Sequence, residues 1–289
     1  MKSFSNLEIE GEPLEISDDF NLDTHIRLSR SVIKNDWKEV VEICQENWEA
    51  LNIPITKSLD TVLHLAAYNK KEDNFEPLLN KLPSEPEKRA KVLLLKNTEG
   101  NSPLHIAASV GSVKMCRIII DRIDSKTSFL SACNNEGETP LFKAVLHGKK
   151  EAFLYFHSIC GPREGYNYFT RTDGETILHR AISKEYFELS FLILRMYSDL
   201  VYLVDKDGKS PLDVLASKPS AFKSGSDLRW FEKIIYHCKY TVKFSRLVAY
   251  LNSQVINLVL LFICSYQLSL LISETPTCTR CIHLSLLSE

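Results

Sequence analysis

The chain has 289 residues, of which 44% are hydrophobic and 25% are charged, and 35 Lys and Arg against 37 Asp and Glu leave a net charge of −2. This composition is that of a globular protein and excludes a wholly disordered or collagen-like chain. The balanced charge also argues against a nucleic-acid partner, because neutralising phosphates requires a clustered excess of cations.

Residues 1–21 form an acidic N-terminal segment without the apolar run that a signal peptide needs. The 8 cysteines are scattered along the whole chain rather than packed into a short framework. We therefore expect reduced thiols and a cytosolic location for the body of the protein.

One short phrase recurs along the chain, and each copy contains a Thr or Ser followed by apolar residues and, in every copy, Ala. The Thr or Ser stands at positions 61, 102, 139, 176 and 210, so successive copies are 41, 37, 37 and 34 residues apart. In the last four copies a glycine lies two residues earlier. Such even spacing is the signature of a repeat protein.

The residue types of the phrase predict a turn followed by a helix. The glycine permits a backbone with positive φ, and the Thr or Ser caps the helix through its hydroxyl. Pro103, Pro140 and Pro211 stand at the first helical position, where the missing N–H does no harm. A second amphipathic helix is expected over residues 113–123, 151–159 and 187–196.

The two ends of the repeat region depart from this pattern. The N-terminal unit is expected to hold one helix over 25–34 and, after Asn35 and Asp36, another over 37–48. In the last unit the second helix is displaced to about 227–237. The prolines of residues 82–87 predict a loop insertion after the second unit.

The phrase resembles the ankyrin repeat, a turn and two helices with the pattern T-P-L-H-x-A. The copies at Ser102 and Thr139 match best, and Asp213 replaces the histidine in the last. The resemblance implies an all-α fold, an ankyrin-repeat solenoid of helix-turn-helix units with short β-turn tips. We expect about six units over residues 22–238, with atypical units at both ends.

The chain is also similar to plant ankyrin-repeat proteins of the accelerated-cell-death type, on residues 35–41, 55–61, 205–212 and 230–232. That resemblance implies a role in stress or defence signalling. Members of this family usually continue into a membrane domain that bears Pro-Gly-Gly. The sequence contains no Pro-Gly-Gly, and we therefore expect a truncated form.

The repeated histidines His64, His105 and His179 are expected to be structural hydrogen-bonding groups. No catalytic triad or phosphate-binding glycine loop follows from the spacing of other residues. Cys278, Cys281 and His283 resemble only half of a zinc site. We therefore expect no enzyme activity, no cofactor and no metal.

In ankyrin-like stacks the turn tips and first helices bind other proteins, and the resemblance carries this role to one set of positions. An acidic stripe of Glu99, Glu136, Glu138, Asp173 and Glu175 runs over the central tips and predicts a partner with a basic segment; a merely solvated edge is the alternative. The candidate protein-binding residues are Thr98, Glu99, Asn101, Asn135, Glu136, Glu138, Leu146, His147, Thr172, Asp173, Glu175, Lys184, Lys206, Asp207 and Lys209.

Residues 239–289 form a basic linker and a hydrophobic tail. Residues 247–273 contain no Asp, Glu, Lys, Arg or His, and basic residues precede them. This pattern predicts a membrane association that leaves the repeats in the cytoplasm. The alternative is that the tail is an aberrant or alternatively spliced end whose hydrophobicity has no selected purpose. The alternative location is that of a soluble cytoplasmic protein. Two functions follow: a protein-binding adaptor, or a membrane-anchored regulator or subunit of a transport assembly.

Overall fold

The computed structural model describes residues 22–124, 126–164 and 168–218. Over these residues the chain is built from short helices joined by turns, and β-type pairing is limited to one isolated bridge between Thr170 and Thr176. The expectation of an all-α repeat fold is therefore confirmed.

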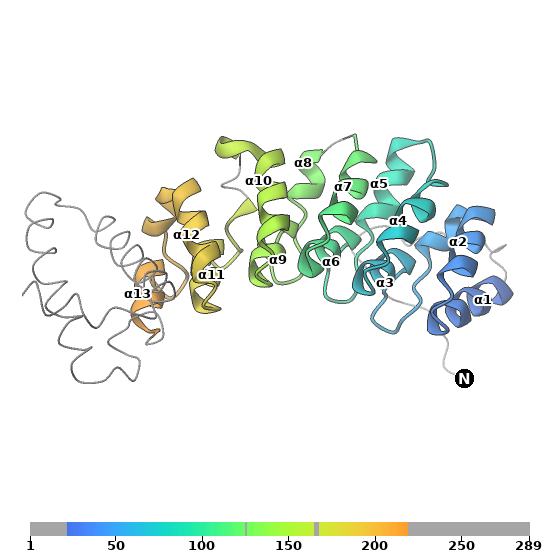
Figure 1. Cartoon of the computed structure of the whole chain (residues 1–289), viewed down its shortest axis with the longest axis horizontal. Helices are drawn as coiled ribbons and strands as arrows, with labels where there is room; N and C mark the ends of the chain where they lie inside the picture. Colours follow the sequence, from blue (N-terminus) through green and yellow to red (C-terminus); the bar gives the residue numbers. More distant parts are fainter. Residues whose placement is uncertain (1–21, 125, 165–167, 219–289) are drawn as a thin grey trace, which may run out of the picture. The chain divides into compact units, whose positions relative to one another are not determined.

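The chain divides into two compact bodies. Among the described residues, the first comprises residues 22–106 together with Lys114–Asp124, and the second comprises Ala107–Val113 and residues 126–164 and 168–218. Helices α6 and α7 contribute residues to both bodies (Figure 1).

The first body begins with the atypical N-terminal unit and continues into repeats of paired helices. Its helices are α1 (Leu22–Ile33), α2 (Trp37–Glu46), the 3₁₀ turn η1 (Trp48–Asn52), α3 (Val62–Tyr68), α4 (Glu72–Leu79), α5 (Pro86–Leu94), and parts of α6 (Pro103–Val110) and α7 (Val113–Asp121).

The second body repeats the same arrangement of helices. Its elements are α8 (Lys126–Leu130), α9 (Pro140–Leu146), α10 (Lys150–Glu164), α11 (Ile177–Ser183), α12 (Phe187–Met196), the 3₁₀ turn η3 (Ser198–Tyr202) and α13 (Pro211–Ala216). Helix α11 packs against α9, α12 and α13, so that the first helices of successive repeats lie side by side (Figure 1).

The start of each first helix follows the physical chemistry of the repeated phrase. Gly137 and Gly174 have φ of 75° and 81°, in the left-handed region that favours glycine. The hydroxyls of Thr139 and Thr176 then accept the backbone N–H of the residue three positions later. These caps satisfy N–H groups that would otherwise have no partner at the helix start.

Two of the repeated histidines, His64 and His179, connect neighbouring repeats by hydrogen bonds, as expected. His64 Nε2 lies 2.9 Å from the carbonyl oxygen of Asn101, and His179 Nε2 lies 2.9 Å from that of Lys209. A carbonyl can only accept, so Nε2 carries the proton and Nδ1 is left to accept the backbone N–H of Thr61 or Thr176. Each ring thus caps its own helix and holds the next turn.

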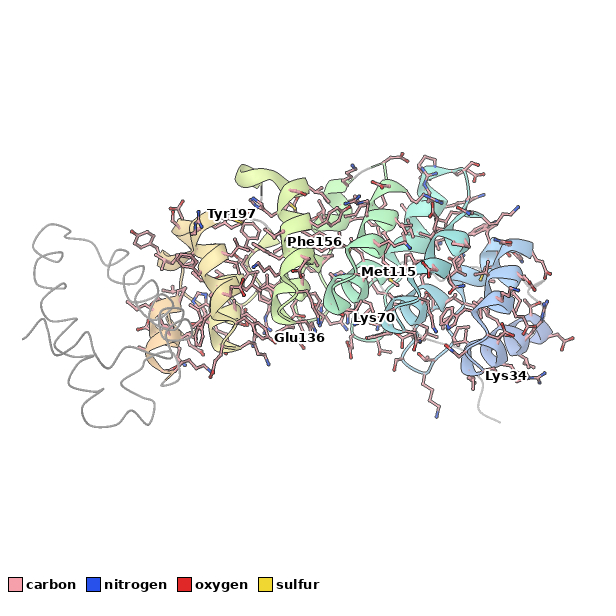
Figure 2. The ribbon with its side chains drawn as sticks, in the orientation of Figure 1. Lys34, Lys70, Met115, Glu136, Phe156 and Tyr197 are labelled. Carbon is pink, nitrogen blue, oxygen red and sulfur yellow. The ribbon has the colours of Figure 1, made fainter. Side chains whose placement is uncertain are left out.

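The core consists of the apolar faces of these helices. In the second body an aromatic cluster joins the longer second helices: the rings of Phe169 and Tyr197 have centroids 4.2 Å apart, and Phe153 and Phe156 are fully buried (Figure 2). Cys44, Cys116 and Cys160 are buried as expected, whereas Cys133 is half-buried. Burial raises the pKa of the Cys44 thiol to about 12 and makes it unreactive.

The structure corrects several details of the expected elements. The loop insertion is shorter than residues 82–87, because Pro86 begins helix α5 at the position where a missing N–H is harmless. Helices α5 and α8 had not been expected. Helix α10 runs to Glu164, five residues beyond its expected end.

Three expectations fall outside the described residues: the displaced helix at 227–237, the hydrophobic stretch 247–273, and the cysteines of the tail. Among the residues that the structure describes, none of the helices is long and apolar enough to cross a membrane. Within the same ranges, no group of three or more His, Cys, Asp or Glu side chains could hold a metal ion.

Candidate functional site

The hairpin tips of the repeats are fixed by side-chain hydrogen bonds to their own backbone. Asn134 Oδ1 accepts the backbone N–H groups of Glu136 and Glu138 at 3.0 and 2.8 Å. Asp205 Oδ1 accepts those of Asp207 and Lys209, both at 2.9 Å. Because the backbone of each tip is held in this way, its outward side chains are presented in a defined geometry.

The fifth repeat has a different residue at this position. Where the other tips have Asn97, Asn134 or Asp205, three residues before the glycine, it has Arg171. Asp173 takes over part of the turn function, since its Oδ1 accepts the N–H of Glu175 at 3.1 Å. The Arg171 guanidinium is thereby free of a turn role and reaches the neighbouring carboxylates.

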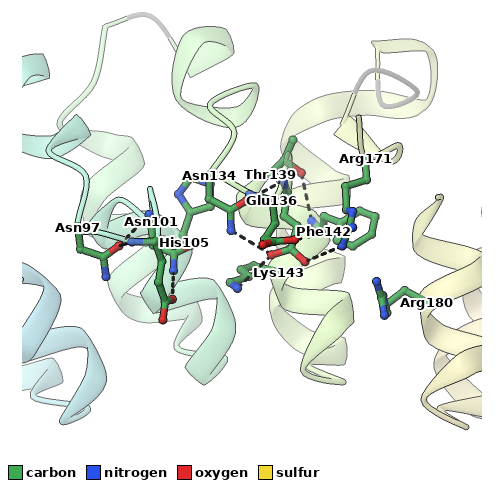
Figure 3. A network of polar contacts seen from close by, with 12 residues as sticks. Asn97, Asn101, His105, Asn134, Glu136, Thr139, Phe142, Lys143, Arg171 and Arg180 are labelled. Atoms are coloured by element: carbon green, nitrogen blue, oxygen red, sulfur yellow. Dashed lines mark hydrogen bonds and ion pairs between the residues drawn. The ribbon is translucent and has the colours of Figure 1, made fainter. Parts of the chain in front are cut away.

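Arg171 is the centre of an ion-pair cluster in the second body (Figure 3). Its Nη2 lies 2.8 Å from Asp173 Oδ2 and 3.8 Å from Glu136 Oε2. Its Nη1 lies 3.8 Å from Glu138 Oε1 and 4.0 Å from Glu175 Oε2. One cation thus faces four of the five carboxylates of the expected acidic stripe.

Two further cations pair with the same carboxylates. Lys143 Nζ lies 3.0 Å from Glu138 Oε2, and Arg180 forms an ion pair with Glu175. Both cations stand four residues after the capping Thr, where Leu65, Ile106 and Val214 are found in the other repeats. That replacement of an apolar residue by a cation was a sequence signal for the cluster, and it was missed.

These contacts change the description of the acidic stripe. The side chain of Glu138 is only 4% exposed, and its pKa lies below the ordinary value: burial alone would raise it, but hydrogen bonds from Asn134 and Lys143 and the nearby Arg171 charge outweigh that effect. Glu138 is therefore a buried structural carboxylate. Glu136, whose side chain is 66% exposed, is the accessible acid of this hairpin.

The other candidate residues divide between surface and interior. Asn101 is buried: its backbone N–H donates to Asn97 Oδ1 and its side chain to Glu99, so it supports the tip and is not available to a partner. Leu146, Asp173 and Glu175 are half-buried. The remaining candidates are exposed: Thr98, Glu99, Asn135, Glu136, His147, Thr172, Lys184, Lys206, Asp207 and Lys209.

The candidate residues are distributed over both bodies. Thr98, Glu99 and Asn101 belong to the first body, and the others belong to the second. Within the second body the exposed candidates lie on the hairpin tips and at the carboxyl ends of α9 and α11. A surface of this kind offers charge and hydrogen-bonding groups to a macromolecule.

The repeated unit is similar to a known protein family. The family model of ankyrin repeats matches residues 63–163 in three copies. The curated proteins include no match to the chain. The copies at Thr176 and Ser210 lie beyond the matched range, yet they have the same positive-φ glycine and the same hydroxyl cap. Ankyrin repeats are therefore present in this chain, and their paired helices form its fold.

Proposed function

We propose that this protein is a non-catalytic adaptor that binds another protein through the tips and first helices of its second body. Ankyrin repeats generally mediate protein–protein interaction, and their fold is typically non-catalytic. The observation that carries the proposal is the set of exposed tip side chains on internally clamped turns, with Asn134 as the best-defined clamp. Such preorganisation lowers the entropy lost on binding.

The finer proposal concerns the partner and the process. Glu136 is the most exposed carboxylate that faces Arg171, with a side chain 66% exposed, and it therefore suits a basic segment of the partner. The process that we propose is stress or defence signalling. Its support is the similarity of residues 35–41, 55–61 and 205–212 to plant ankyrin-repeat proteins of the accelerated-cell-death type.

A single charge reversal tests the adaptor proposal without disturbing the fold. Glu136→Lys changes an exposed acid, whereas reversal of Glu138 would place a cation in a buried ion-pair cluster and would report on folding. Glu151, exposed on the second helix α10, offers a matched control. We expect proximity labelling with the full chain to recover partners several-fold less with Glu136→Lys and undiminished with Glu151→Lys. Equal recovery with both variants would contradict a partner on the tips, and turnover by the purified chain would contradict a non-catalytic role.

A second proposal, a membrane-anchored regulator or subunit of a transport assembly, rests on the uncharged stretch 247–273 and the basic residues before it. The repeats would then face the cytoplasm. Retention of the full chain in the membrane pellet after alkaline carbonate washing, with release on deletion of residues 247–289, supports this proposal. A full chain that stays in the supernatant favours the soluble cytoplasmic alternative.

A further inference from the structure

Three basic side chains occupy the same position in successive repeats of the second body. His147, Lys184 and Lys218 each stand eight residues after the capping Thr or Ser, where the earlier repeats have Asn69 and Val110. His147 and Lys184 are the C-cap residues of α9 and α11, and Lys218 follows the C-cap of α13. Because α11 packs against both α9 and α13, the three positions form a row, here called the cationic row.

Few acidic side chains form ion pairs with the cationic row. Lys218 Nζ lies 3.8 Å from Glu185 Oε1, a long contact between side chains that are 27% and 45% exposed. The ion pairs within the described ranges do not include Lys184, and Lys184 and His147 are both exposed. Lys143 and Lys149 add positive charge beside His147, and Lys143 is already paired with Glu138.

We propose that the cationic row binds an acidic segment of a protein partner. The inference rests on the proposed adaptor function and names a second contact of the same surface. Basic side chains of the partner would bind at Glu136 on the tip, and its carboxylates would bind to the cationic row at the ends of the first helices. Such a two-sign pattern fixes the register of a bound chain, because a shifted segment would bring like charges together.

A protein fits this surface better than a nucleic acid does. The row offers only three basic side chains, and small or apolar side chains, Leu146, Ser183 and Ser217, precede them in the sequence. The carboxylates of the neighbouring tips would repel a phosphate backbone, and the chain as a whole has a net charge of −2. Single-stranded DNA therefore serves as the competing ligand in the test.

The electrostatic surroundings of His147 give the interaction a pH dependence. Partial burial and the charges of Lys143, Lys149 and Lys184 lower the pKa of His147, against a smaller opposing effect of Glu138. The free protein therefore has a neutral imidazole at neutral pH. A bound carboxylate favours the protonated ring, so binding takes up a proton and strengthens as the pH falls towards the pKa of His147.

The test uses the full chain and three fluorescently labelled probes: a twelve-residue peptide of Glu and Gly, the same peptide with Lys in place of Glu, and dT12. Fluorescence anisotropy is measured at low salt, between pH 7.5 and 5.5. We expect the acidic peptide to bind more tightly than dT12, and Lys184→Glu to weaken it by about tenfold. Lys126→Glu, an exposed cation of α8, should leave it unchanged. His147→Gln should remove the strengthening at low pH.

Each outcome decides the inference. Equal weakening by Lys184→Glu and Lys126→Glu, a preference for dT12, or an unchanged pH dependence in His147→Gln contradicts an acidic protein segment on this row. Circular dichroism of each variant confirms that the fold is kept. If the acidic peptide does not bind as expected but Glu136→Lys still lowers partner recovery, this inference alone is overturned. Loss of both effects overturns the proposed function as well.

Discussion

The helix caps contribute to the stability of each repeat, and Thr139 is the position where this contribution can be measured most clearly. Its hydroxyl accepts the backbone N–H of Phe142 at 3.1 Å and donates to the carbonyl oxygen of Tyr168 at 2.8 Å. Thr139→Ala removes both bonds in a site that is 2% exposed. The lost cap costs about 1 kcal/mol and the buried carbonyl left without its partner about 1–2 kcal/mol, so we expect about 2–3 kcal/mol in total.

Equilibrium urea unfolding, followed by circular dichroism at 222 nm, measures this loss. With a slope of about 2 kcal/mol per molar urea, Thr139→Ala should lower the midpoint by about 1 M. Thr139→Ser is the matched control, because it keeps the hydroxyl and loses only a buried methyl group worth about 1 kcal/mol. If the Ala and Ser variants unfolded at the same midpoint, the hydroxyl bonds would contribute nothing and the reasoning would be refuted.

Three further predictions concern the charges and turns of the second body. Burial lowers the pKa of His179 below 6.5, so this histidine is protonated more readily in the unfolded chain than in the folded chain. The free energy of unfolding should therefore fall as the pH drops below about 6.5. His179→Gln should reduce this pH dependence, as measured by urea unfolding at pH 7.5, 6.5 and 5.5. Arg171→Ala should lower the free energy of unfolding by about 2 kcal/mol. The loss should be distinctly smaller in a Glu138→Gln background, because the buried side chain is then neutral. A double-mutant cycle that finds no coupling between the two positions would contradict the ion-pair cluster. A Cβ at Gly174 would meet the carbonyl oxygen of Val204 at 3.1 Å, whereas one at Gly208 would meet nothing within 4 Å. Gly208→Ala should therefore lower the free energy of unfolding only by the left-handed backbone penalty of about 1–2 kcal/mol. Gly174→Ala should lower it measurably more in the same assay.

The sequence was sufficient for the repeat because its signals are local. A glycine, a hydroxyl cap and a proline within five residues specify a turn and a helix start wherever they occur, and Gly137, Thr139 and Pro140 behave as those rules predict. Helix ends were less certain. Gly161 and Pro162 favour a helix end close to the expected one, yet α10 continues through them to Glu164.

The candidate site was predicted less well, because charge depends on neighbours that are distant in the sequence. Glu138 and Glu136 are two residues apart in one tip, yet one is buried in ion pairs and the other is exposed. Both carboxylates lie 3.8 Å from Arg171 of the next repeat, and Glu138 is held in addition by Lys143 and by the side-chain N–H of Asn134. Aligning the repeats position by position reveals Arg171, where the other tips have Asn97, Asn134 or Asp205, and Lys143 and Arg180, where the other repeats have an apolar residue.

The central claim is that the tips and first-helix ends of the second body hold a partner protein. Site-specific photo-crosslinking in cells tests it most directly, with the photoreactive residue placed at position 136 or 184, and at position 151 or 195 on the second helices as controls. The account predicts covalent protein adducts from positions 136 and 184 and none from 151 and 195. Adducts from the control positions alone would contradict it.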